Sequence, residues 1–201
     1  MSAGRVIVFL KAPRPGFVKT RIAAQLDAEA AVAIYQVLVG MTLSRLTGRK
    51  DVELRFAPDD AALELGCWRR PGWSVRPQGE GDLGDRMSRA SEDAFTEGAK
   101  GVVILGADCP EFGAHDIDAA FEALGGHDVV LGPASDGGYW LVGLSRPLPG
   151  LFREIPWSSD RVFETTLQRA IDSKLRVAEL RRLRDIDTLE DWRTWLREHP
   201  L

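Results

Sequence analysis

The chain has 201 residues, 44% of them hydrophobic and 28% charged, which is the composition of an ordinary soluble globular protein with one full-sized domain. Asp and Glu outnumber Lys and Arg by 30 to 26, and the net charge of −4 argues against a general nucleic-acid binder, because such proteins are normally basic. The two cysteines, Cys67 and Cys109, are too few for a disulfide framework, and no apolar run has the length of a signal peptide or a membrane span. We therefore expect a cytoplasmic protein.

Short apolar runs alternate with longer amphipathic runs along the chain. The apolar runs predict strands at residues 6–10, 52–57, 73–77, 101–106, 128–131, 139–144 and 177–180. The amphipathic runs predict helices at 22–46, 60–65, 85–97, 114–124, 160–171 and from 188 onward, the fifth capped by Ser158 or Ser159 and the last by a capping box from Thr188 to Asp191. This alternation predicts one α/β domain over residues 1–201, with a mostly parallel sheet whose ligands bind beyond the carboxyl ends of the strands.

The loop after the first predicted strand is rich in positive charge. Four cationic side chains surround a glycine turn at the expected start of a helix: Lys11, Arg14, Lys19 and Arg21 around Gly16. Free N–H groups and the helix dipole favour an anion there, whereas extra cations at that end destabilise a helix with no anion bound. The spacing is neither that of a Walker A loop nor that of G-x-G-x-x-G. We favour a phosphate-binding loop over a merely solvated one.

A glycine-rich loop follows the third predicted strand, at residues 78–84. Gly79 and Gly81 allow the backbone to approach a ligand closely, and Gln78 has the donors and acceptors to read a base or a sugar edge. The alternative is a flexible surface loop with turn glycines. This loop alone does not decide between them.

Two other loops supply carboxylates directly after apolar strands. Asp108 follows the strand at 101–106, and Asp185 and Asp187 follow the strand at 177–180. A hard cation such as Mg²⁺ takes one or two carboxylates and completes its shell with water and phosphate oxygens. We expect a Mg²⁺ or Mn²⁺ site at Asp108 with one of the later pair. The alternatives are that Asp108 caps the next turn and that Asp187 caps the last helix.

A turn motif precedes the sixth predicted strand. Asp136, Gly137 and Gly138 are an ordinary turn signal, but Tyr139 and Trp140 beside an open carboxylate also suit a sugar or another polar, ringed substrate, with Trp157 as a second aromatic wall. Aromatic residues lie in the core more often than they face a ligand, so Asp136 carries most of this interpretation. The three histidines lack metal-ligand spacing and no G-x-S-x-G elbow occurs, which excludes a histidine metal site and a Ser-His-Asp hydrolase.

As an ordered set, these motifs resemble a known family. The chain is similar to small bacterial proteins of the nucleotide-diphospho-sugar transferase (GT-A) superfamily, which are often regarded as glycosyltransferases, some of them in arsenosugar biosynthesis clusters. The resemblance covers residues 6–192 and rests on K-A-P-R-P-G-x-V-K-T-R, G-x-G-D-L-G-x-R-M, G-A-D-C-P, G-P-A-x-D-G-G-Y-W-L-V-G and R-D-I-D. It implies a three-layer α/β/α, Rossmann-like GT-A fold with a central, mostly parallel mixed sheet.

The resemblance also implies a nucleotide site over the first half of the chain. By motif position, Lys19 and Arg21 match cations that contact the phosphates. Gly79, Gly81 and Asp82 match positions near the base and the ribose.

An acceptor site is implied over the second half. Asp108 matches the metal-binding carboxylate, with Asp185 or Asp187 as its distant partner, and Asp136 and the glycines after it border the acceptor or sugar pocket. Two features depart from related patterns: the metal strand ends in A-D-C instead of a full D-x-D, and the G-G-x-S-x-R loop of many nucleotidyltransferases is missing. The first loop is nearer to that of guanylyltransferases with the same fold.

The motifs together with the resemblance predict a metal-dependent transferase that acts on a nucleotide-activated substrate. The resemblance alone favours transfer of a sugar from a nucleotide-diphospho-sugar to a small acceptor. Lys19 and Arg21 would neutralise charge on the pyrophosphate, and Asp136 would orient or deprotonate the acceptor. One alternative is guanylyl-type nucleotidyl transfer, which joins a nucleoside triphosphate to a phosphorylated acceptor. Another is a nucleotide-binding module without turnover. The sequence leaves open whether the protein forms a homodimer.

Overall fold

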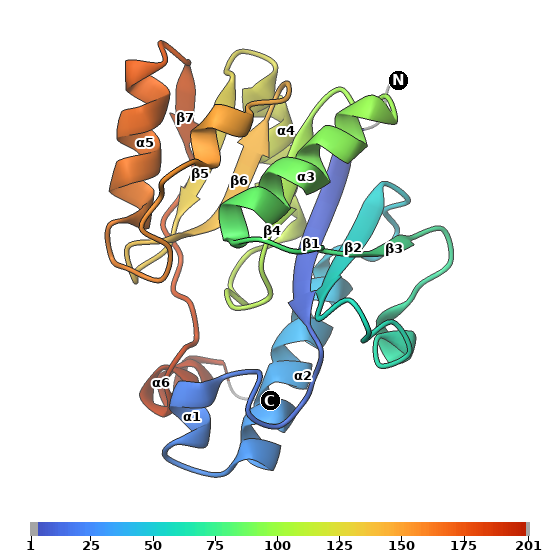
Figure 1. The fold of residues 1–201 in the computed structure, drawn as a ribbon. Helices are drawn as coiled ribbons and strands as arrows, with labels where there is room; N and C mark the ends of the chain where they lie inside the picture. Colours follow the sequence, from blue (N-terminus) through green and yellow to red (C-terminus); the bar gives the residue numbers. More distant parts are fainter. Residues whose placement is uncertain (1–3, 200–201) are drawn as a thin grey trace.

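The computed structural model describes residues 4–199, and within them seven strands join one mixed sheet (Figure 1). The order across the sheet is β3-β2-β1-β4-β6-β5-β7. The strands are β1 (Arg5–Lys11), β2 (Val52–Ala57), β3 (Ser74–Pro77), β4 (Val102–Leu105), β5 (Val129–Pro133), β6 (Tyr139–Leu144) and β7 (Val177–Glu179). Strand β6 runs antiparallel to both of its neighbours, and every other pair of neighbours is parallel. The predicted mixed, mostly parallel sheet is confirmed.

Helices cover both faces of the sheet, as an apolar sheet of parallel strands requires. They are α1 (Thr20–Ala23), α2 (Ala28–Arg45), α3 (Leu83–Thr96), α4 (Ala114–Leu124), α5 (Val162–Asp172) and α6 (Leu189–Glu198), with short 3₁₀ turns η1 (Gly66–Trp68) and η2 (Pro149–Phe152). Side chains of α2 and α4 share one core cluster with β1 and β4, and side chains of α3, α5 and η2 share another on the opposite face. Figure 1 shows α3 on the near side of the sheet.

A third core cluster lies beyond the carboxyl end of β1. It joins Ile22 of α1, Ile34 and Leu38 of α2, and Trp195 of α6 to Ile186, which lies in the segment between β7 and α6. Figure 1 shows α1 and α6 beside the lower half of α2, away from the sheet. The cluster fixes the segment that carries Asp185 and Asp187.

Three sequence predictions of local structure are wrong. The helix at 22–46 is two helices, because Asp27 is extended and its carboxylate accepts the N–H of Ala30, which starts α2 afresh. The helix at 60–65 is a run of tight turns, such as Ala61 N–H to Pro58 carbonyl. Helix α5 begins after Arg161 without a side-chain cap, and the Ser159 hydroxyl donates to the Pro156 carbonyl instead.

The capping box at the start of the last helix is confirmed, with Thr188 as N-cap and Asp191 as its partner. Asp187 is therefore not the cap of this helix. Among residues 4–199, no helix combines the length and the apolar character needed to cross a membrane.

Candidate active site

Four loops that follow parallel strands meet at one edge of the sheet. Two backbone hydrogen bonds connect them: the N–H of Ile186, after β7, donates to the carbonyl of Asp108, after β4, at 2.9 Å, and the N–H of Ser135, after β5, donates to the carbonyl of Leu183 at 2.9 Å. The loop after β1 joins them through Lys19. The carboxylates that the sequence separates are therefore brought together in space.

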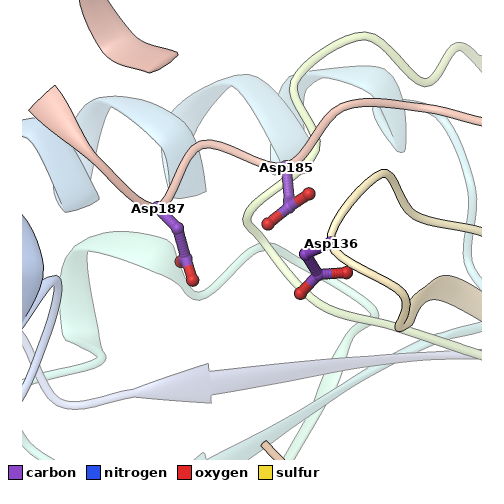
Figure 2. Close-up of side chains that lie close together, drawn as sticks. All are labelled: Asp136, Asp185 and Asp187. Atoms are coloured by element: carbon purple, nitrogen blue, oxygen red, sulfur yellow. The ribbon is translucent and has the colours of Figure 1, made fainter. Parts of the chain in front are cut away.

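Asp136, Asp185 and Asp187 form a carboxylate cluster. One oxygen from each residue lies within 4.8 Å of the others, and Figure 2 shows the three side chains around a common space. Asp185 and Asp187 are half-buried, and Asp136 is exposed. Burial, followed by the neighbouring charge of Asp136, raises the pKa of Asp185 to about 6. Asp185 and Asp187 therefore both belong to the carboxylate cluster. Asp136 belongs to it as well, although the sequence predicted for it only a position at the acceptor site.

Asp108 lies beside this cluster and is linked to it by Lys19. The amine Nζ of Lys19 is 2.5 Å from Oδ1 of Asp108 and 3.1 Å from Oδ1 of Asp187, and the lysine side chain is 5% exposed. Burial alone would lower the pKa of Lys19, but the two carboxylates outweigh it and raise that pKa. Arg21 is further out: its guanidinium is 3.6 Å from Oδ2 of Asp187, and its side chain is 70% exposed.

The first loop leads into a much shorter helix than the sequence predicts. Helix α1 is a single turn of four residues, so its dipole is small and the argument from a helix N-terminus does not hold. Gly16 has a φ of 81°, as a glycine turn requires, and Lys11 is exposed at the end of β1. Arg14 is held by Asp60 and Glu64.

The glycine-rich loop at residues 78–84 is firmly held. Gln78 is buried, and its amide donates to the carbonyls of Leu10 and Arg55, so its N–H groups hold β1 and β2. Gly79 and Gly81 have φ values of 79° and 98°, which favour glycine.

At the end of the same loop, Asp82 is the N-cap of α3 in a capping box with Asp85. Arg86 and Arg89 of α3 donate to loop carbonyls. Nucleotide binding by this loop stays a prediction.

The predicted acceptor residues lie around the turn between β5 and β6. Asp136 Oδ1 accepts the N–H of Gly138 at 2.7 Å, which fixes the carboxylate. Tyr139 and Trp157 pack edge to face with ring centroids 6.5 Å apart, and Trp157 also lies against Gly84 at the start of α3. The aromatic pair therefore bridges this turn and the end of the glycine-rich loop.

A cavity of about 270 Å³ opens on the carboxylate cluster from the side of α6. Its lining includes all three carboxylates of the cluster and residues that the sequence did not single out: Glu111, Arg184, Thr194 and Trp195. Trp195 also stacks on Trp192 at 5.5 Å. Arg184 is the first residue of the motif R-D-I-D, and Glu111 directly follows G-A-D-C-P, so these motifs were the available signal for both residues. Nothing in the sequence pointed to Trp195, because it lies on the last helix.

Solved structures are similar to this fold over nearly its whole length. A candidate nucleotide-diphospho-sugar transferase from Desulfovibrio desulfuricans G20 has 31% identity and a TM-score of 0.92, covering 100% of this chain and 89% of its own. The inositol-1-phosphate CTP transferase from T. maritima has 13% identity and a TM-score of 0.64, covering 98% and 96%. Rv0371c from Mycobacterium tuberculosis H37Rv, solved with manganese, has 16% identity and a TM-score of 0.57, covering 98% and 100%. The neighbours named for an activity are transferases, and they confirm the fold that the resemblance implied.

A search of curated proteins finds no significant match. A family model described as "Uncharacterized protein conserved in bacteria (DUF2064)" matches residues 42–159, which include Asp108 and Asp136. That match covers more than half of the chain, and the Desulfovibrio protein extends the similarity over all of it. The chain therefore belongs to the DUF2064 family of bacterial proteins.

Proposed function

We propose that this protein is a metal-dependent transferase that uses a nucleotide-diphospho-sugar as donor and a small molecule as acceptor. The observation that carries the proposal is the meeting of three carboxylates with Lys19 and Asp108 at the carboxyl edge of the sheet. That edge is where α/β sheets bind their ligands. The Desulfovibrio relative, itself a candidate transferase of this kind, supports the choice of donor.

The residues present fit a hard divalent cation. Every donor in the cluster is a carboxylate oxygen, and Mg²⁺ and Mn²⁺ prefer oxygen ligands. Asp136, Asp185 and Asp187 would hold the ion, with Asp108 beside it. The ion would neutralise negative charge on a pyrophosphate group. Manganese in the structure of the related fold makes Mn²⁺ a suitable probe.

The protein groups divide between donor and acceptor. Lys19 and Arg21 bind the phosphates and offset the charge that builds up when the bond between the sugar and the diphosphate breaks. Asp136 also faces the cavity, where it accepts the proton of an acceptor hydroxyl while the oxygen of that hydroxyl bonds to the sugar carbon. The nucleoside diphosphate leaves. Lys11, Gly16 and residues 79–82 complete the proposed nucleotide site. Gln78 is left out of it, because it is buried and its amide already donates to Leu10 and Arg55.

Release of nucleoside diphosphate from a panel of nucleotide sugars, with and without Mn²⁺, tests the proposal. We expect Mn²⁺-dependent release that falls at least about 100-fold in Asp185→Asn and Asp187→Asn, because each change removes an anionic ligand. Asp172→Asn, an exposed carboxylate on α5, is the control and should match the wild type.

Other products would identify other functions. Release of pyrophosphate from a nucleoside triphosphate would show nucleotidyl transfer. The protein would not be an enzyme if it bound nucleotide tightly without turnover and if neither Mn²⁺ nor the two active-site substitutions changed that binding.

A further inference from the structure

The amine of Lys19 is already engaged by protein carboxylates. It contacts Asp108 and Asp187, and the side chain is almost fully buried. Lys19 also has a φ of 46°, a left-handed conformation that residues with a side chain rarely adopt. A lysine free to bind phosphate would be expected to extend into solvent, so these contacts have a role of their own.

Asp187 belongs to two arrangements at once. Its Oδ1 accepts from Lys19, and the same carboxylate is a member of the carboxylate cluster. A divalent ion in that cluster would stand next to the lysine ammonium, and two cations this close repel each other. The ammonium and the metal would also need lone pairs of the same carboxylate, that of Asp187. The ammonium and the metal therefore oppose each other's binding.

We propose that Lys19 is an internal counter-ion that competes with the metal for Asp187 and is drawn away by the phosphates of the nucleotide. The inference rests on the proposed function. Without nucleotide, the ammonium neutralises the carboxylates and the metal binds weakly. A bound phosphate takes the ammonium as its own counter-ion and frees both carboxylates. Metal and nucleotide then each strengthen the binding of the other, as linkage requires.

Titration with Mn²⁺ alone, followed by calorimetry, tests the competition without any turnover. Lys19→Met keeps the length of the side chain and removes its charge, and we expect it to bind Mn²⁺ at least about tenfold more tightly than the wild type. Lys50→Met removes an exposed charge just before β2, at the opposite edge of the sheet, and should bind Mn²⁺ as the wild type does. Equal or weaker Mn²⁺ binding by Lys19→Met would overturn the inference.

A second titration measures the coupling between metal binding and nucleotide binding. Adding GDP, UDP, CDP or ADP in turn should tighten Mn²⁺ binding to the wild type with at least one of the four. This gain should be smaller in Lys19→Met, where only the direct attraction between the metal and the phosphates remains. A gain that is equal in both proteins would also count against the inference.

A measurement on the unmodified chain covers the case in which Lys19→Met does not fold. Amine labelling, followed peptide by peptide by mass spectrometry, reports the exposure of each lysine. Mn²⁺ should raise the labelling rate of Lys19 and leave that of Lys50 unchanged; an unchanged rate for Lys19 would contradict displacement.

The outcomes separate the inference from the proposed function. If Mn²⁺ binds and depends on Asp185 but not on the charge of Lys19, only the inference fails. If neither the wild type nor Lys19→Met binds Mn²⁺, the metal-dependent function fails with it.

Discussion

Gly137 holds Asp136 in the carboxylate cluster through a close approach of two backbones. It has a φ of 90°, and a Cβ added there would lie 2.1 Å from the carbonyl oxygen of Asp160. Its own carbonyl accepts the N–H of Phe163 at the start of α5. The sequence indicated a turn at Asp136 and Gly137, but it gave no sign that Asp160, 23 positions later in the chain, would pack against the glycine.

A side chain at this position should disturb both the fold and the site. We expect Gly137→Ala to lower the free energy of unfolding by about 2–4 kcal/mol, because both the positive φ and the contact with Asp160 become unfavourable. Mn²⁺ affinity should fall as Asp136 shifts. Thermal melting and Mn²⁺ titration measure the two effects.

Gly150→Ala is the matched control for this substitution. No atom lies within 4 Å of a Cβ added at Gly150, and its φ is not in the left-handed range, so it should change stability by less than about 1 kcal/mol. A Gly137→Ala protein with the stability of this control would disprove the close approach.

The elements that were predicted well are those with a clear local pattern. The helix at 114–124 and the strand at 139–144 have the predicted bounds, because an amphipathic run and a nearly continuous apolar run define them without help from other segments. The elements that were predicted wrongly depend on contacts with distant segments or on a second local signal that competes with the first. Asp27 starts a new helix inside an apolar periodicity, and the expected helix at 60–65 has its acidic residues Asp60 and Glu64 paired with Arg14, which lies in another loop.

Helix α4 also anchors the segment after β7. Asp116, in its first turn, accepts the N–H of Gly113 at 2.7 Å and both Nε and Nη2 of Arg181 at 2.8 Å, and its side chain is 6% exposed. Arg181 stands four residues before Asp185. The pair therefore connects the start of a helix to the strand exit that carries the proposed metal ligands.

Removal of the Asp116 charge should destabilise the protein in a pH-dependent way. Burial would raise the pKa of Asp116, but Arg181 and the N–H of Gly113 hold it below its usual value. Such a carboxylate stabilises the fold above its unfolded pKa of about 4, and the contribution is lost as the pH falls through the lower folded pKa. We expect Asp116→Asn to cost about 2 kcal/mol at pH 7.

Urea unfolding at several pH values checks this expectation. The difference between Asp116→Asn and the wild type should shrink as the pH falls below about 4. Asp118→Asn, on the same helix but with an exposed side chain paired with Arg49, should cost less than about 1 kcal/mol at any pH. A pH-independent loss in Asp116→Asn would show that the ion pair contributes little.

At the scale of the whole molecule, the site depends on the order of strands in the sheet. The sequence located each loop, because each follows an apolar run, but strand order decides which loops are neighbours. Strand β6 inserts antiparallel between β4 and β5, so β5 lies beside β7, and Asp136 comes close to Asp185 and Asp187. The ion pairs of Lys19 could not be predicted from the sequence either, because they join residues far apart in the chain.

The third core cluster should couple global packing to metal binding. Ile186 is 2% exposed and lies between two proposed ligands, so Ile186→Ala should cost about 2–4 kcal/mol of stability and weaken Mn²⁺ binding by about tenfold. Leu43→Ala, equally buried on α2, should cost as much stability and leave Mn²⁺ affinity unchanged. Denaturant unfolding and Mn²⁺ titration compare them. Loss of stability in Ile186→Ala with wild-type Mn²⁺ affinity would show that the segment holds its ligands without this anchor.

The stacked tryptophans near the site give the protein an optical signal of its own. Trp195 lines the cavity and stacks on Trp192 and on His199. Indole emission depends on the polarity and the charges around the ring, so a molecule that enters the cavity should change the ultraviolet fluorescence of the unlabelled chain. Candidate acceptors can therefore be screened by fluorescence before any product is known. A Trp195→Phe protein, which keeps the other five tryptophans, would show how much of the change comes from the ring that borders the cavity.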